Sequence, residues 1–296
     1  MRLRPSVVVY GNVPGDPTWD AAPRGGAAII YLPATVFLFP WYTALCLAQG
    51  ALVAIPAVGR DASRRHAVLG RAGPAAAMVI GVGTVRVAGG SGADLLAWLG
   101  TFATPILAGV LGWAARWRWP FLTAAAAAVL YLIAWQAGGH LAEAAGATLI
   151  GGACLAIAAI VGPITPARYL AVGLVILIAV DVYLVWGNRQ VEQTTSALQQ
   201  ATLPQVGVSS HKSKPLPALQ QVDLGNSSMG WLDFLAPALL GAVVGRRTRP
   251  RVRAAIAVAV AALAWGFMLE LTSPIPATVP MLAGLAVTWP AWWRGT

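Results

Sequence analysis

Two aspartates stand inside long apolar runs of this sequence, where a carboxylate is costly. Asp181 lies in LVILIAVDVYLVWG and Asp233 lies in SSMGWLDFLAPALLGAVVG. Carboxylates in such runs bind cations, relay protons or hydrogen-bond to neighbouring helices. A close pair can also hydrolyse a bond, because one carboxyl group holds a proton while the other accepts a proton from water. Asp94, Glu143 and Glu270 lie near the ends of their apolar runs, where a membrane interface can solvate them.

The composition predicts that these runs lie in a membrane. The chain is 58% hydrophobic and only 10% charged, whereas a soluble domain carries about 25% charged residues. The net charge of +10 comes from Lys and Arg that gather between apolar runs, which is typical of cytoplasmic loops and does not indicate nucleic-acid binding. Cys46 and Cys154 lie in apolar runs, and no Cys/His spacing suits zinc. We expect no metal or organic cofactor.

The fold predicted is an all-α bundle of about nine membrane spans, because each span needs about 20 mostly apolar residues. The first apolar run is long and contains Pro33 and Pro40, so we count it as one span, with two shorter segments as the alternative. The predicted spans are Ala27–Ile55, Ala67–Ala88, Ala93–Ala115, Trp119–Ala137, Leu141–Val161, Ala167–Trp186, Met229–Gly245, Ala254–Leu271 and Ile275–Trp293.

The distribution of Lys and Arg orients this bundle. The GRRTRPRVR cluster and the loops on its side carry most of the basic residues, so this side is predicted to be cytoplasmic. A multi-pass cell-membrane protein then has its N-terminus outside and its C-terminus inside. We expect an extracytoplasmic tail over 1–26, an N-terminal bundle of about five helices over 27–161, and a C-terminal bundle over 167–293. The long polar segment 187–228 becomes an extracytoplasmic loop, either a flexible linker or a substrate-gating segment.

The two aspartates are predicted to lie at matching depth. Asp181 precedes Trp186 by five residues and Asp233 follows Met229 by four. Both therefore lie roughly 6–8 Å inside the outer ends of helices that the chain connects directly. These two residues alone favour transport or proton coupling over proteolysis. A third segment at the same depth, SPIPATVPMLAG, changes the balance, because its prolines leave backbone carbonyls that need partners. It is either a kinked helix end or exposed backbone that can bond an extended peptide.

In this order the three segments resemble the presenilin and signal-peptide-peptidase family of intramembrane aspartyl proteases, as a divergent bacterial or archaeal-type member. In that family one catalytic aspartate lies on the sixth span, one on the seventh, and a Pro-Ala-Leu motif opens the ninth. Here VDVYLVWG, MGWLDFLAPALLGA, KPLPAL and PATVP are similar to the corresponding family segments. The resemblance implies Asp181 and Asp233 as the catalytic pair. It implies a substrate-binding role for Gly230, Pro276, Ala277 and Thr278.

The sequence departs from the family pattern at three positions. Leu232 stands where the family has a second Gly before Asp, Val180 replaces a Tyr, and Thr278 replaces the Leu of Pro-Ala-Leu. We expect an endopeptidase that cleaves transmembrane helices or signal-peptide remnants, with a transmembrane peptide and the lipid bilayer as its partners. The alternatives are a proton-coupled transporter or channel that uses the same aspartates, and a non-catalytic scaffold that binds helices.

Overall fold

The computed structural model describes residues 40–55, 91–187, 216–219, 221–225, 227–245, 247–266 and 276–293. The predicted tail 1–26 and the predicted span Ala67–Ala88 lie outside these residues, as does most of the predicted loop 187–228. The described ranges are mostly helical, as the apolar runs predict.

Eight α-helices lie in the described part of the chain, and a short π-helical segment, η3 (Tyr183–Gly187), continues one of them. The helices are α2 (Pro40–Ala54), α4 (Ser91–Ala114), α5 (Pro120–Gln136), α6 (Gly139–Ile164), α7 (Ala167–Val182), α9 (Trp231–Val244), α10 (Thr248–Gly266) and α11 (Met281–Trp293). Two of these helices are long and apolar enough to cross a membrane, over Ala97–Ala114 in α4 and over the whole of α6. They favour insertion into a membrane, and the larger number of spans stays a prediction.

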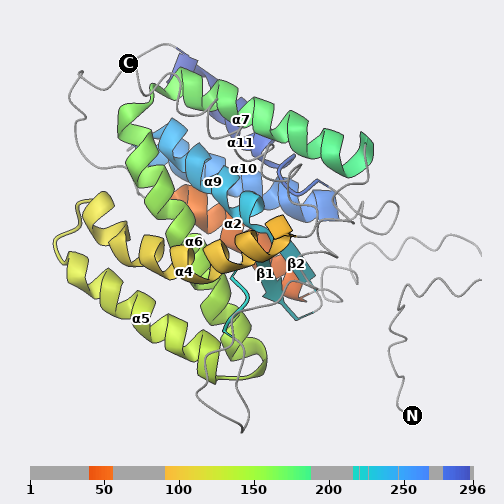
Figure 1. Cartoon of the computed structure of the whole chain (residues 1–296). Coiled ribbons are helices and arrows are strands. Elements are labelled where there is room, and N and C mark those ends of the chain that lie inside the picture. Colours follow the sequence, from red (N-terminus) through yellow and green to blue (C-terminus); the bar gives the residue numbers. More distant parts are fainter. Residues whose placement is uncertain are drawn as a thin grey trace, which may run out of the picture.

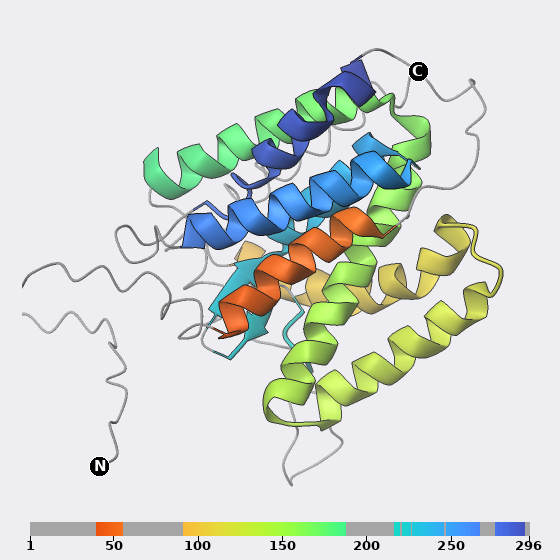
Figure 2. The same ribbon diagram turned by 180° about the vertical axis from the view of Figure 1, so that it is seen from behind.

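Helix α9 lies at the centre of the bundle, where it contacts α2, α6, α7, α10 and α11 (Figure 1). Helices α4 and α5 pack on each other and on α6, and they form a flank away from α7 and α11 (Figure 1). From behind, α2 and α10 run side by side (Figure 2). The helix that carries Asp233 is therefore enclosed by five others, including the α7 helix that carries Asp181.

Two glycines bring α2 close to its neighbours. A Cβ atom on Gly50 would lie 3.0 Å from the carbonyl oxygen of Ala255 in α10, and one on Gly241 of α9 would lie 3.1 Å from that of Val53. In each case the neighbour is backbone, which cannot turn away as a side chain can. Small residues allow helices in an apolar medium to approach to this distance and gain dispersion contacts. They set how closely α2 approaches the aspartate-bearing helix.

A β-hairpin that the sequence did not predict precedes α9 in the otherwise mostly helical described residues. Strands β1 (Gln221–Leu224) and β2 (Ser227–Gly230) pair antiparallel, with Val222 opposite Met229. Val222, Leu224 and Met229 are buried, so one side of the hairpin packs on the bundle. This packing fixes an extended conformation over residues that the apolar run assigned to a span starting at Met229. The helix begins at Trp231 instead, and it has only 14 residues.

Helix α10 begins within the basic cluster, at Thr248 rather than at the predicted Ala254. The Arg251 guanidinium donates a hydrogen bond from Nη2 to the carbonyl oxygen of Gly245, directly after the end of α9. The last carbonyls of a helix lack intrahelical donors, and a cation there also complements the helix dipole. Arg251 of the basic cluster therefore stabilises the end of α9. The cluster's predicted role in orienting the bundle is separate from this contact.

Candidate active site

Asp181 lies in the last turn of α7, where the helix changes to the π-helical segment η3. Its Oδ2 atom accepts two hydrogen bonds from Thr278, one from the side-chain hydroxyl at 2.5 Å and one from the backbone N–H at 3.3 Å. Single π-helical turns inside α-helices occur frequently at functional sites. The two bonds from Thr278 hold the Asp181 carboxylate against the segment that precedes α11, 97 residues further along the chain.

Asp233 lies in the first turn of α9. Its Oδ2 atom accepts a hydrogen bond of 2.8 Å from the backbone N–H of Gly230, the residue before the helix. A carboxylate here satisfies a donor that the helix start leaves unpaired and complements the helix dipole. Asp233 thus has a structural role at the start of its own helix. The bond occupies only Oδ2, and a carboxylate can accept further bonds through its other oxygen.

The two carboxylates belong to one site. Helices α7 and α9 are in contact. The segment that bonds Asp181 through Thr278 also shares the Gln49 amide with the backbone of Asp233. Both side chains are half-buried. Two carboxyl groups that share a confined site do not in general ionise together readily, because like charge and burial both oppose the second negative charge. One protonated and one ionised carboxyl group is the arrangement that can both activate water and protonate a leaving group.

The segment Pro276–Pro280, which leads into α11, forms the third wall of the site. The carbonyl oxygen of Pro276 accepts a hydrogen bond of 3.0 Å from the indole Nε1 of Trp265 in α10. Trp265 also contacts Trp186 of η3, with ring centroids 6.1 Å apart. The ends of α7 and α10 are thereby joined to this segment. All six residues predicted for the site (Asp181, Gly230, Asp233, Pro276, Ala277 and Thr278) lie in the three segments that meet here.

Two of the departures from the family pattern have clear structural consequences. The Leu232 side chain is 48% exposed, so it points away from the bundle core and does not fill the space beside Asp233. Thr278 is fully buried, and its hydroxyl bonds directly to Asp181, which a leucine could not do. At Gly230, a Cβ atom would lie 3.3 Å from Oδ2 of Asp233, which is a tight contact with the carboxylate itself.

Gln49 of α2 belongs to this neighbourhood, although the sequence analysis did not single it out. Its side chain is 1% exposed, and its amide Nε2 atom donates to the carbonyl oxygens of Asp233 and Ala277 at 3.1 and 3.5 Å. The available signal was a lone amide in the apolar run TALCLAQGALVA. A polar side chain in such a run needs a partner from another helix, which is a reason to look for one.

Of the carboxylates predicted to lie at span ends, Glu143 has a defined structural role. Its Oε2 atom contacts Nδ1 of His140 at 2.9 Å and accepts a bond of 2.8 Å from the backbone N–H of Gly225 in the hairpin turn. The His140 ring lies 4.2 Å from the ring of Trp41 in α2. Glu143 therefore fastens the turn of the hairpin to α6 and α2. The Asp94 side chain and Glu270 lie outside the described residues.

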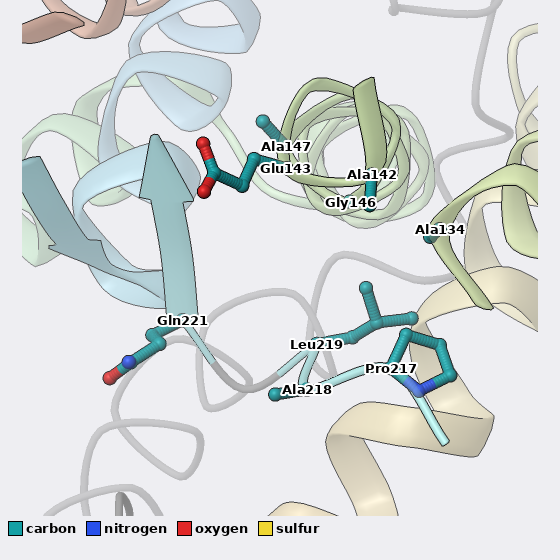
Figure 3. A pocket seen from close by; sticks show the side chains of 9 residues that line it. All are labelled: Ala134, Ala142, Glu143, Gly146, Ala147, Pro217, Ala218, Leu219 and Gln221. Carbon is teal, nitrogen blue, oxygen red and sulfur yellow. The ribbon is translucent and has the colours of Figure 1, made fainter. Parts of the chain in front are cut away.

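A cavity of about 150 Å³ lies beside this hairpin, between α5, α6 and the residues 217–219 and 221. Its lining consists of four alanines and Gly146, with Pro217, Leu219 and the polar Glu143 and Gln221 (Figure 3). Glu143 extends toward strand β1, and Gln221 extends away from α6 (Figure 3). Neither aspartate lines this cavity. It offers apolar surface and a carboxylate already bonded to His140 and Gly225, which is not a set of groups for chemistry.

No protein-family model, curated protein or solved structure matches this chain. Any functional assignment therefore depends on the arrangement of the site residues and on the resemblance of short segments.

Proposed function

We propose that this chain is an intramembrane aspartyl protease of the presenilin and signal-peptide-peptidase type. It cleaves transmembrane helices or signal-peptide remnants with a water molecule activated by Asp181 and Asp233. One observation carries the proposal. Asp233 has a partner carboxylate, Asp181, on the contacting helix α7, 52 positions earlier in the chain (233 − 181), and Gln49 and Thr278 join their two segments. An aspartate whose only role was to cap its own helix would not need this partner.

The third wall of the site supports hydrolysis over ion transport. The segment Pro276–Pro280 contains two prolines, which cannot donate backbone hydrogen bonds. The carbonyls of Pro276 and Ala277 accept side-chain donors from other helices, so this backbone can bond to partners outside the segment. The hairpin β1–β2 ends at Gly230, three residues before Asp233, and offers extended backbone at the same place. Exposed extended backbone binds a peptide strand by main-chain hydrogen bonds. A substrate helix has to unwind before cleavage, because a helical peptide keeps its carbonyls in internal hydrogen bonds.

The site lies within a multi-pass bundle of about nine spans in this proposal, with the N-terminus outside and the C-terminus in the cytoplasm. The apolar helices α4 and α6, which pack together, support a position in the bilayer. In this orientation, water reaches the aspartates from the outer side of the bilayer. The reaction needs only water and the two carboxyl groups.

The test uses purified full-length protein in liposomes with a fluorescently labelled transmembrane peptide. Wild type cleaves the peptide, and Asp181→Asn and Asp233→Asn each abolish cleavage while both proteins keep their helical circular dichroism. Proton uptake into the same liposomes is measured in parallel. Proton flux that either aspartate variant abolishes, without cleavage of any peptide in a broad panel, would overturn the proposal in favour of a proton-coupled transporter. If neither Asp181→Asn nor Asp233→Asn changes peptide cleavage or proton uptake, the remaining interpretation is a non-catalytic scaffold.

A further inference from the structure

Gln49 is the polar side chain at the candidate site to which the mechanism so far gives no role. It comes from α2, which contacts α9 and carries neither aspartate. Its Nε2 atom lies 3.1 Å from the carbonyl oxygen of Asp233, 3.5 Å from that of Ala277 and 3.8 Å from Sδ of Met229. The bond to Asp233 is the shorter and stronger of the two carbonyl bonds.

The carbonyl of Asp233 needs this donor because of a proline. In an α-helix the carbonyl of residue i accepts the N–H of residue i+4. The residue four positions after Asp233 is Pro237, which lies inside α9 and has no N–H. Gln49 therefore supplies the hydrogen bond that the helix itself cannot make at Asp233.

The carbonyl oxygen of Ala277 also lacks a local N–H donor because of a proline. In a β-turn this oxygen would accept the N–H of the residue three positions later, which is Pro280. The next N–H along the chain, that of Met281, is bonded to the carbonyl of Thr278 at 3.0 Å. Gln49 thus meets two carbonyls that lost their local donors to two different prolines.

The Oε1 atom of Gln49 adds to this argument. It is buried and has no hydrogen-bond partner among the described residues. An unsatisfied buried acceptor is destabilising, so packing does not account for an amide at this position. The two carbonyl oxygens that accept hydrogen bonds from Nε2 explain why an amide side chain stands here.

We propose that Gln49 is a positioning residue of the candidate site. Its single amide group supplies the donor that both prolines remove, and it thereby fixes the wall that carries Asp233 against the wall that holds Asp181. The connection is continuous: Gln49 binds Ala277, the next residue Thr278 binds Asp181, and Gln49 also binds the backbone of Asp233. As a statement about catalysis, this inference rests on the proposed protease function.

The test compares Gln49→Leu, Pro237→Ala and the double variant in the full-length protein, with Thr288→Val as the matched control. Thr288 is also buried and polar, but among the described residues its hydroxyl bonds to Gly284 and Leu285 of its own helix and not to the site. Gln49→Leu is expected to lower kcat for the labelled peptide by about tenfold to a hundredfold, because small misplacements of reacting groups have effects of this size. KM is expected to change by less than about twofold. The pH–rate profile is expected to shift, because this profile reports the pKa values of the essential acid and base, which Gln49 positions.

The double variant makes the test specific. Pro237→Ala returns an N–H to the carbonyl of Asp233, so it recovers part of the activity that Gln49→Leu loses. The double-mutant cycle therefore gives a non-zero interaction energy. Additive effects, or a Gln49→Leu profile identical to that of Thr288→Val, would overturn the inference. If Gln49→Leu does not fold, Gln49→Asn replaces it, because the shorter amide cannot reach both carbonyls.

A measurement without substrate separates this inference from the proposed function. The infrared band of protonated carboxyl groups is titrated in each variant and assigned with Asp181→Asn and Asp233→Asn. Among the described residues, the titratable side chains on helices that contact α9 include Asp181 of α7, Tyr42 and Cys46 of α2, and Cys154 of α6. No variant in the cycle changes any of these four. Gln49→Leu is expected to move the midpoint by about half a pH unit or more, and Thr288→Val is not. If the midpoint shifts in Gln49→Leu but the protein cleaves no peptide, the protease proposal is refuted and the positioning role of Gln49 stands. If the midpoint does not shift, the positioning role is refuted.

Discussion

The hydroxyl of Thr278 is the contact whose removal tests the site most selectively. Thr278→Val replaces the hydroxyl by a methyl group of similar size in a fully buried side chain, so the packing is kept. The Asp181 carboxylate then loses its bond of 2.5 Å and retains only the backbone N–H at 3.3 Å. Catalysis should therefore suffer more than stability.

The size of the effect follows from the bond that is lost. A hydrogen bond to a charged group contributes about 1.5–3 kcal/mol. A change of about 1.4 kcal/mol in the activation barrier alters a rate tenfold. If the whole bond orients Asp181 in the transition state, Thr278→Val lowers kcat by about tenfold to a hundredfold. Thr278→Ser keeps the hydroxyl and recovers most of the rate.

The assay measures kcat and KM for cleavage of a transmembrane peptide, with thermal unfolding of each variant in parallel. Thr288→Val serves as the control, because it removes a buried hydroxyl from the adjoining helix without touching an aspartate. We expect similar melting temperatures for both valine variants and a large difference in kcat. Equal kcat for the two variants would refute the view that Thr278 holds a catalytic carboxylate.

Three further predictions concern the elements around the site. Gly241→Val destabilises the fold, measured as a lower unfolding temperature, because its Cβ meets the backbone oxygen of Val53 at 3.1 Å. Leu232→Ala changes cleavage by less than about twofold and stability by about 0.5 kcal/mol or less, since the side chain points outward. Glu143→Ala removes the acceptor of the Gly225 N–H, and amide exchange at Gly225 is expected to rise about tenfold as the hairpin turn loosens.

The helices of the bundle could be predicted because their signal is local. Uninterrupted apolar runs bounded by Pro, Gly and Arg placed α4, α5, α6 and α7 within a few residues of their observed limits. The start of α9 was wrong, because Met229 reads as part of an apolar run but is buried by strand pairing with Val222. The start of α10 was wrong because its arginines were taken as loop, whereas Arg251 lies on the helix and bonds the end of α9.

The site could be predicted in part for the same reason. The order of α7 and α9 in the chain favours their contact, which the structure has, and the prolines near Thr278 indicated a third segment whose carbonyls need partners. The matching depth of Asp181 and Asp233 in a membrane stays a prediction. The hydroxyl bond from Thr278 and the part played by Gln49 depend on which helix faces lie together, and this is not encoded locally. Gln49 lies 184 residues before Asp233, so no spacing in the sequence connects them.

The most direct test of the central claim is cleavage of a labelled transmembrane peptide in water enriched in oxygen-18, with the fragments mapped by mass spectrometry. The account predicts that wild type produces two fragments from a cut within the apolar stretch. The new carboxyl terminus carries one heavy oxygen, and Asp181→Asn, Asp233→Asn and a transition-state inhibitor of aspartyl proteases each abolish both fragments. Fragments that persist at the wild-type rate in either asparagine variant would contradict it.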